Sequence, residues 1–243
     1  MDIRNNKGAV TKIYAKTIED ACLEQLNGLV NNPAYENETI RIMPDTHTGK
    51  GSVIGFTSTY DDMIIPNTVG VDISCGMLCA NLGKVDIDMR ALDTLPRLQI
   101  PSGLSVHEGR VTTFKELEKM NCFRNLKDSK RIVRSIGTLG GGNHFIELDR
   151  SESGDIYLVI HTGSRNLGKQ VCEYYQKIAV DLCHGKEQIY EERERIIREY
   201  KRQGRRNEIQ KALRGRKCET VECNIPDDQC YLYGKYMADY LHD

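Results

Sequence analysis

The amino-acid sequence predicts an α+β fold in which mixed β-sheets are surrounded by helices. In the first two thirds of the 243 residues, Gly, Pro and Asn recur at short intervals, which favours short strands and functional loops. The last third carries longer stretches with helical periodicity. The hydrophobic content of 39% is ordinary for a globular chain and suffices for one large domain or two small ones.

Local patterns place the elements along the chain. Thr17 and Asp20 mark the start of a helix, which residues 31–33 end. Short runs typical of strands follow at 39–43, 52–59, 63–65, 77–82, 144–148 and 157–160. Helical periodicity returns over 173–180 and 189–213, and Gly204 is expected to break the second of these helices.

A last amphipathic helix is predicted from the spacing of Tyr231, Tyr236, Met237 and Tyr240. No further element follows it within these residues, so we expect the fold to be incomplete at its carboxyl end. The aromatic face of this helix should then stay exposed, and each exposed aromatic forfeits about 1.5–3 kcal/mol of burial free energy. The chain is therefore expected to be only marginally stable.

Composition predicts a cytoplasmic location. The first residues are polar where a secretory signal needs an apolar core, and no run reaches the roughly 20 apolar residues of a membrane span. The nine cysteines of such a chain are expected to be reduced. Cys218, Cys223 and Cys230 have irregular spacing without an accompanying histidine, which favours ordinary thiols over a zinc site.

Charge is distributed unevenly, although the formal net charge is only −1. Residues 198–217 contain nine Lys or Arg against two Glu, within a basic helical excursion predicted over 186–217. A polyanion such as RNA could bind there. A solvated helix in which Arg side chains pair with nearby Glu explains the pattern equally well, so both interpretations stay open.

The segment VGVDISCGM, residues 69–77, places a carboxylate and a thiol around a bend. Asp72 and Cys75 can point at one cation if the backbone between them turns tightly, which Gly70 and Gly76 permit. Taken alone, the same residues also fit a turn that Asp72 caps and a small, buried Cys75.

Two later segments combine glycines with histidines. In TLGGGNHFIEL, residues 138–148, successive glycines allow backbone amides to approach a phosphate, and His144 follows them. In YLVIHTGSRNLGKQV, residues 157–171, a buried-type strand delivers His161 to its carboxyl end, and Arg165 follows. Each segment has an ordinary structural explanation, but three such sets together favour a site for a divalent cation and a phosphate.

Five blocks of the sequence resemble, in this order, the signature blocks of the RtcB RNA-splicing ligases: MPDTHTGKGSVIGF (43–56), IIPNTVGVDISCGM (64–77), IPSGLSVHEGR (100–110), TLGGGNHFIEL (138–148) and HTGSRNLG (161–168). The resemblance implies that residues 1–243 are the amino-terminal portion of a single RtcB-like catalytic domain, with 186–217 as an excursion within it.

The implied activity is that of an RNA ligase that depends on GTP and on two Mn2+ ions. It would join a 3′-phosphate or 2′,3′-cyclic phosphate end to a 5′-hydroxyl end through a guanylylated histidine, in tRNA splicing or RNA repair. By the resemblance, Asp72, Cys75 and His144 hold one ion, and Cys75 bridges to a second ion held by His161. By affinity order these soft ligands prefer Zn2+, so manganese comes from the resemblance alone.

The resemblance also implies the nucleotide and RNA contacts. Asn143, Phe145 and Glu147 would contact the GMP moiety, and Arg165 would lie near the RNA phosphates. The implied partners are GTP and RNA, either tRNA halves or broken RNA, together with an activating protein. No membrane partner is expected.

One part of the family pattern is missing from this sequence. His47 and His107 fall in family-like blocks without an assignable role, whereas His184 and His242 lie outside them. By the resemblance, the guanylylated histidine is expected beyond the end of this chain, which alone is not expected to ligate. Two other classes remain open: a non-catalytic metal-binding or RNA-binding module, and a metal-dependent phosphoesterase. A binding module would form no covalent nucleotide adduct, whereas a phosphoesterase would release phosphate from RNA.

Overall fold

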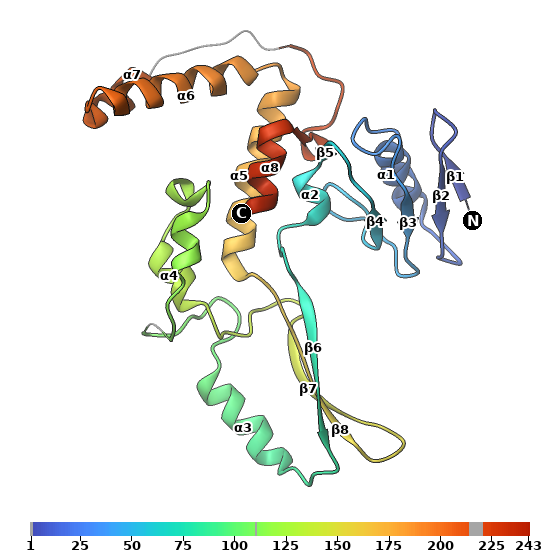
Figure 1. Ribbon diagram of the computed structural model, residues 1–243. Coiled ribbons are helices and arrows are strands. Elements are labelled where there is room, and N and C mark those ends of the chain that lie inside the picture. Colours follow the sequence, from blue (N-terminus) through green and yellow to red (C-terminus); the bar gives the residue numbers. More distant parts are fainter. Residues whose placement is uncertain (1, 110, 214–220) are drawn as a thin grey trace. The chain divides into compact units, whose positions relative to one another are not determined.

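The computed structural model describes residues 2–109, 111–213 and 221–243 (Figure 1). It confirms the predicted α+β class, since several helices accompany small sheets. Contacts divide the chain into two compact units: unit 1 comprises residues 1–69 and 175–241, and unit 2 comprises residues 70–174 and 242–243. The long helix α5 (Arg165–Cys183) contributes residues to both units. The single catalytic domain stays a prediction.

Unit 1 begins with a four-stranded sheet. Its strands β1 (Asp2–Arg4), β2 (Val10–Ile13), β3 (Ile40–Ile42) and β4 (Phe56–Ser58) lie in that order. Strands β2 and β3 are parallel, and α1 (Asp20–Val30) forms the crossover between them. Leu26 and Leu29 of α1 and Ile42 of β3 are fully buried in the hydrophobic core of this unit. Sequence patterns missed β1 and β2, because strands this short carry little periodicity.

The strand predicted over 52–59 was too long, because extended structure begins only at Phe56. Gly51 and Gly55 adopt φ values of +75° and +78°, which bend the backbone away from the sheet. A Cβ atom on Gly51 would lie 2.7 Å from Cβ of Asn67. Residues 51–55 therefore form a tightly packed loop that leads into β4.

The rest of unit 1 is mostly helical. Strand β5 (Met63–Ile64) pairs with β9 (Leu232–Tyr233), and α2 (Pro66–Val69) follows β5. The remaining elements are α6 (Glu187–Arg202), η3 (Arg206–Glu208), α7 (Ile209–Leu213), η4 (Asp227–Gln229) and α8 (Gly234–His242). The break expected at Gly204 is confirmed, since α6 ends before it and its φ is +72°.

The aromatic face of the last helix is buried, so the expected exposure was wrong. Tyr236 and Tyr240 are only 5% and 6% exposed. The Tyr240 ring lies 5.2 Å from the Tyr175 ring of α5, and the Tyr236 ring lies 5.8 Å from the Tyr190 ring of α6. Aromatic rings of α5 and α6, which precede α8 in the sequence, therefore pack against this face, and α8 lies beside α5 in Figure 1.

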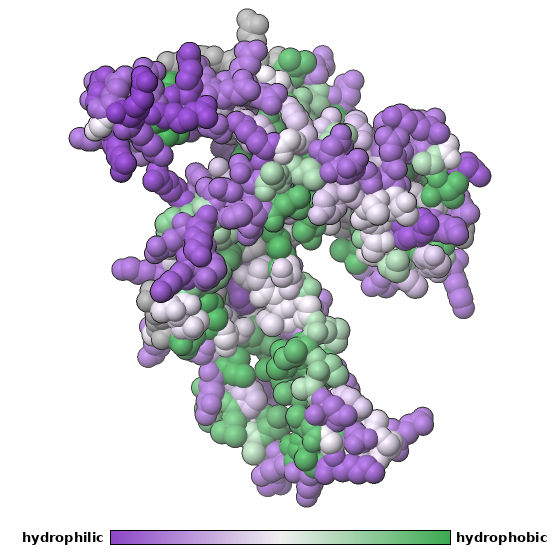
Figure 2. All heavy atoms as spheres, viewed as in Figure 1, coloured by the Kyte–Doolittle hydropathy of each residue, from purple (hydrophilic) through white to green (hydrophobic). Residues whose placement is uncertain are grey.

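Unit 2 contains an antiparallel sheet of β6 (Gly76–Gly83), β8 (Ile156–Thr162) and β7 (Phe145–Arg150), in the order β6-β8-β7. Helices α3 (Met89–Gln99) and α4 (Ser129–Arg134) and the 3-10 turns η1 (Lys115–Lys119) and η2 (Phe123–Asn125) accompany it. Figure 2 shows hydrophobic residues at the surface over β6 and α3, where Met77 and Leu98 are exposed.

Helix α3 has no buried residue and contains Pro96, so apolar periodicity did not reveal it. Its one local signal is Asp88, whose side chain accepts hydrogen bonds from the amides of Arg90 and Ala91 at the helix start. None of the helices in the described part of the chain combines the length and the apolar composition that crossing a membrane requires.

Candidate metal and phosphate site

The sheet of unit 2 brings three predicted metal ligands to one edge. Strand β6 begins directly after Cys75, β7 begins directly after His144, and β8 ends at residues 161–162. Because β8 runs antiparallel to both neighbours, His161 pairs with Met77 on one side and with Phe145 on the other. One ligand atom each from Cys75, His144 and His161 therefore lies within 4.8 Å of the others.

Short contacts join these side chains and Asp72 in pairs. Sγ of Cys75 lies 2.8 Å from Nε2 of His161, and Nε2 of His144 lies 2.8 Å from Oδ2 of Asp72. The His144 side chain is buried, whereas that of Asp72 is partly exposed. The sequence expectation that Asp72, Cys75, His144 and His161 could face one cation thus has a geometric basis.

The two imidazole rings are held in the orientation that a metal site needs. Nδ1 of His144 lies 3.0 Å from the carbonyl oxygen of Leu139, and Nδ1 of His161 lies 3.1 Å from the carbonyl oxygen of Asn143. A carbonyl only accepts hydrogen bonds, so each Nδ1 carries the hydrogen and donates it. This leaves Nε2 of both rings turned toward Cys75 and Asp72, as in metal-bound histidines.

The Cys75 thiol carries a proton that a bound cation would displace. Burial, followed by the charge of Asp72 and a hydrogen bond with it, raises the pKa of the Cys75 thiol. The thiol is therefore protonated near neutral pH in the absence of an ion. A thiol, two imidazole nitrogens and a carboxylate form a donor set that suits a divalent cation, and binding would release the thiol proton.

The bend between Asp72 and Cys75 differs in detail from the expectation. The amide of Cys75 donates to the carbonyl oxygen of Asp72 at 3.0 Å, and the left-handed residues are Gly70, with φ +95°, and Ser74, with φ +61°. Gly76 has no positive φ and already belongs to β6. The turn is therefore closed by Ser74, a non-glycine residue in a conformation that costs free energy and often occurs at functional sites.

Two glycines outside this bend leave room for the side chains of Asp72, His144 and Arg165. A Cβ atom on Gly163 would overlap the carboxylate of Asp72. A Cβ atom on Gly140, whose φ is +98°, would overlap both the guanidinium of Arg165 and the imidazole of His144. Both positions therefore require glycine, because any side chain would collide with these groups. The sequence alone does not reveal this requirement.

A cavity of about 690 Å3 is lined by two of the predicted ligands and by three cationic side chains. Its lining includes Asp72 and His144 together with Arg131, Arg165 and Lys169. Nη2 of Arg165 donates to the carbonyl oxygen of Gly103 at 2.6 Å, and Nε donates to Thr138 at 3.1 Å, which fixes the guanidinium at the cavity wall. A phosphate group beside a metal ion fits this arrangement of charges.

The cavity also contains cations that sequence motifs missed. Lys169 follows Arg165 by four residues on α5, and this helical spacing could have revealed it. Arg131 comes from α4, and its side chain donates to the carbonyl oxygen of Leu104. Nothing in the neighbouring sequence marks Arg131 as part of the cavity, because only tertiary packing brings α4 close to Leu104.

The predicted nucleotide contacts are less concentrated. Asn143 is exposed beside the ligands, and the Phe145 ring packs against the His161 imidazole at 5.4 Å. Glu147 instead lines a separate cavity of about 470 Å3 together with α3 residues. His107 lies near the carbonyl oxygen of Gly137, and His47 belongs to unit 1 near the carbonyl oxygen of Asp45. The structure thus does not gather all predicted residues in one place.

Comparisons with known proteins point in one direction. The family model described as "tRNA-splicing ligase RtcB" matches residues 25–124 and 106–206. The RNA-splicing ligase RtcB of Escherichia coli (strain K12) is 30% identical over 207 residues, which cover 73% of this chain and 49% of that protein. RNA-splicing ligase RtcB homolog 2 of Entamoeba dispar is 33% identical, covering 58% of this chain and 37% of that protein.

An archaeal relative, the tRNA-splicing ligase RtcB of Methanococcus maripaludis, is 26% identical over 218 residues. The match covers 68% of this chain and 45% of that protein. The chain therefore spans about half the length, or less, of the curated relatives it matches.

Proposed function

Because the chain belongs to the tRNA-splicing ligase RtcB family, we propose that it serves GTP-dependent and Mn2+-dependent RNA ligation. The reaction joins an RNA 3′-phosphate or 2′,3′-cyclic phosphate end to a 5′-hydroxyl end, in tRNA splicing or RNA repair. The observation that carries this proposal is the convergence of Cys75, His144 and His161 beside a cavity with cationic walls. Metal ions and cationic side chains both stabilise the negative charge of a reacting phosphate group.

In this proposal Asp72, Cys75 and His144 hold one metal ion, and Cys75 is shared with a second ion that His161 also holds. Two such cations would neutralise phosphate charge and lower the pKa of an attacking hydroxyl. The short Cys75–His161 and His144–Asp72 contacts support this assignment of ligands to two ions. Carbonyl groups at both Nδ1 atoms orient the rings for it.

The phosphates of GTP and of RNA would occupy the cationic cavity. Arg165 is held there by two hydrogen bonds and faces the RNA phosphates, and Arg131 and Lys169 add charge to the same cavity. Asn143, Phe145 and Glu147 contact the guanylate in this proposal, as in the family pattern. The proposed location is the cytoplasm, with tRNA halves or broken RNA as substrate and an activating protein as a further partner.

The basic excursion offers a second surface for RNA. Figure 2 shows a strongly hydrophilic surface over α6 and α7, and Arg198, Lys201 and Arg202 are exposed there. Some charges are compensated locally, since Arg205 pairs with Glu208 at 2.6 Å and lies 4.8 Å from the Tyr200 ring centre. Residues 214–217 of the basic stretch lie outside the described residues.

Replacing Cys75 by alanine is expected to remove bound Mn2+. The substitution deletes the sulfur shared by both proposed ions, so affinity should fall by more than the roughly 10–100-fold that the loss of an outer-shell partner causes. Metal analysis after equilibration with Mn2+ measures the effect. Cys79→Ala is the matched control, because Cys79 is an exposed thiol on β6, the strand that begins directly after Cys75, and lies outside the cluster. Equal Mn2+ content in both variants would disprove the metal assignment.

No histidine of this chain is expected to form a covalent bond with GMP. We propose that the guanylylated residue is none of its six histidines, because His144 and His161 would serve the metal and the resemblance gives the other four no such role. Incubation with radiolabelled GTP and Mn2+, followed by denaturing gel electrophoresis, should show no labelled band. A stable phosphoramidate mapped to any of these histidines would contradict this assignment while supporting a ligase.

A further inference from the structure

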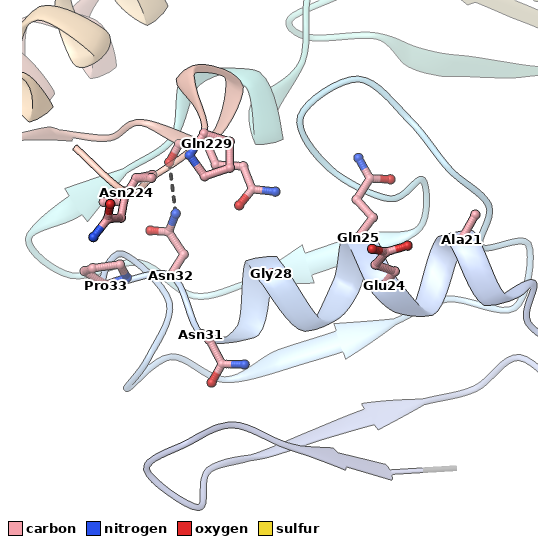
Figure 3. A pocket seen from close by; sticks show the side chains of 11 residues that line it. Ala21, Glu24, Gln25, Gly28, Asn31, Asn32, Pro33, Asn224 and Gln229 are labelled. Carbon is pink, nitrogen blue, oxygen red and sulfur yellow. Dashed lines mark hydrogen bonds between the residues drawn. The ribbon is translucent and has the colours of Figure 1, made fainter. Parts of the chain in front are cut away.

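A groove of about 510 Å3 runs along one face of α1 in unit 1 (Figure 3). Its floor includes Ala21, Gln25 and Gly28, which follow one another at helical spacing. Residues 224–226 and Gln229 line the opposite wall. Ala21 and Gly28 are exposed and carry only a methyl group or no side chain, so the floor is open between its longer side chains.

Hydrogen bonds to main-chain groups hold the wall in place. Nδ2 of Asn32, just after α1, donates to the carbonyl oxygen of Gln229 at 2.9 Å (Figure 3). The Gln229 amide donates to the carbonyl oxygen of Pro226 at 2.8 Å. Nε2 of Gln176 on α5 donates to the carbonyl oxygen of Cys230, the next residue of the wall segment, at 3.1 Å. The wall is thus fixed to the end of α1 and to α5, and the groove is preformed.

The side chain of Gln229 extends from the wall toward the floor. Gln229 is only 8% exposed, and both its Nε2 and its Oε1 lie 3.6 Å from the position that a Cβ atom on Gly28 would take. Within the described parts of the chain, no group makes a hydrogen bond with this carboxamide. A buried amide without a partner costs free energy. Its donor and its acceptor, which lie side by side, are therefore available to a ligand in the groove.

Charge at the groove is negative. Glu24 is exposed and is the one charged side chain among the described residues that line it. Helix α1 has no basic residue in its last turn, so the negative end of its dipole is not offset there. Residues 221–230, which include the wall, contain Glu222, Asp227 and Asp228 but no Lys or Arg. These charges repel the phosphates of a nucleic acid and attract a basic ligand.

An extended peptide has the groups that complement a carboxamide. In an extended chain, the N–H and the C=O of one residue point to the same side and bond to the same partner. The C=O and N–H of a carboxamide pair with both. Asn224 places a second, exposed carboxamide on the same wall. The floor from Ala21 to Asn32 spans about 16 Å at about 1.5 Å a residue, enough for about five extended residues.

We propose that this groove binds an extended, basic peptide segment of a partner protein. The Gln229 carboxamide pairs with the main chain of one peptide residue, and Asn224 adds a contact on the same wall. Glu24 pairs with a Lys or Arg side chain of the peptide. The site lies in unit 1 and does not depend on the ligation proposed for unit 2.

Fluorescence polarisation with the whole chain tests the proposal. The probe is a labelled heptapeptide in which Ala alternates with Lys or Arg, and we expect it to bind. Gln229→Met, which keeps the side-chain volume and the main-chain hydrogen bonds, should weaken binding about tenfold, the usual effect of losing one or two hydrogen bonds. N-methylation of the central peptide groups should weaken binding to the unchanged chain by a similar factor. Methylation should cause no further loss with Gln229→Met.

Two pairs of variants separate the groove from the rest of α1. Gly28→Leu fills the floor without removing a hydrogen bond and should abolish binding. Asn27→Leu places the same side chain on the adjacent, exposed position outside the groove and should not affect binding. Glu24→Gln should weaken binding severalfold and reduce its salt dependence, whereas Glu19→Gln, an exposed position before α1, should change neither. Circular dichroism checks that each variant is folded.

Three results would overturn the proposal. One is the absence of binding with the basic heptapeptide at about 1 mM. Another is equal binding of a heptapeptide that carries Glu in place of each Lys or Arg. The third is displacement of the probe by a single-stranded oligouridylate whose own binding is lost with Gly28→Leu, which would assign the groove to RNA. If Gln229→Met fails to fold, the comparison of Gly28→Leu with Asn27→Leu still decides, because both positions are exposed on α1.

Discussion

Replacing Gly140 by alanine is expected to abolish metal binding in unit 2. The added Cβ atom would overlap the Arg165 guanidinium and the His144 imidazole, so both groups must move away from the cavity. The φ of +98° adds strain of about 1–3 kcal/mol for a non-glycine residue. Mn2+ at 100 times its dissociation constant should stabilise the unchanged protein by about 2.7 kcal/mol. The variant should lose this stabilisation, which thermal unfolding with and without Mn2+ measures.

Gly142→Ala provides the matched control for this experiment. Gly142 belongs to the same loop and has a φ of +74°, yet no atom lies within 4 Å of the position that its Cβ would take. Both variants should therefore lose some stability through backbone strain, but only Gly140→Ala should lose the response to Mn2+. If Gly142→Ala abolishes the response equally, loop strain controls binding, and the steric explanation is wrong.

Replacing Tyr240 by alanine is expected to destabilise unit 1 by about 3–5 kcal/mol, the usual cost of removing a large buried aromatic side chain. Tyr240 is 6% exposed, and its ring packs at 5.2 Å against that of Tyr175. Urea unfolding followed by circular dichroism measures the change, since unit 1 contains several helices that contribute to the signal.

Leu241→Ala is the control, because Leu241 is the next residue of α8 and is 48% exposed. Its substitution should change the free energy of unfolding by about 0.5 kcal/mol or less. If both variants were equally stable, the aromatic face of α8 would not contribute to the core. The original expectation of a weakly packed carboxyl end would then be correct.

Local sequence patterns predicted the class of the fold and the residues of the proposed metal site. The α+β class followed from the change between short, glycine-interrupted runs and long helical periodicity, and the structure confirms it. Asp72 and Cys75 are close in the sequence, and His144 and His161 flank strands, so each could be recognised from its immediate neighbours. Functional side chains beside strands and glycine bends can often be recognised in this way, because these elements have local sequence signatures.

Strand register decided how these ligands meet. The pairing of His161 with both Met77 and Phe145 sets the distance between three segments that are remote in the sequence. A shift of one residue would turn His161 to the opposite face of the sheet. Register depends on all partners at once, so a local pattern does not contain it. Arg131 was missed because only tertiary packing brings α4 to the cavity.

Burial of the last helix was likewise decided by tertiary structure. The spacing of Tyr236 and Tyr240 predicted an apolar helix face, but only the packing of α5 and α6 determined what covers it. The irregular spacing of Cys223 and Cys230 favoured ordinary thiols, and both are free thiols in the structure. Helical periodicity is set by bonds within one segment, whereas these contacts join segments whose meeting depends on the free energy of the whole fold.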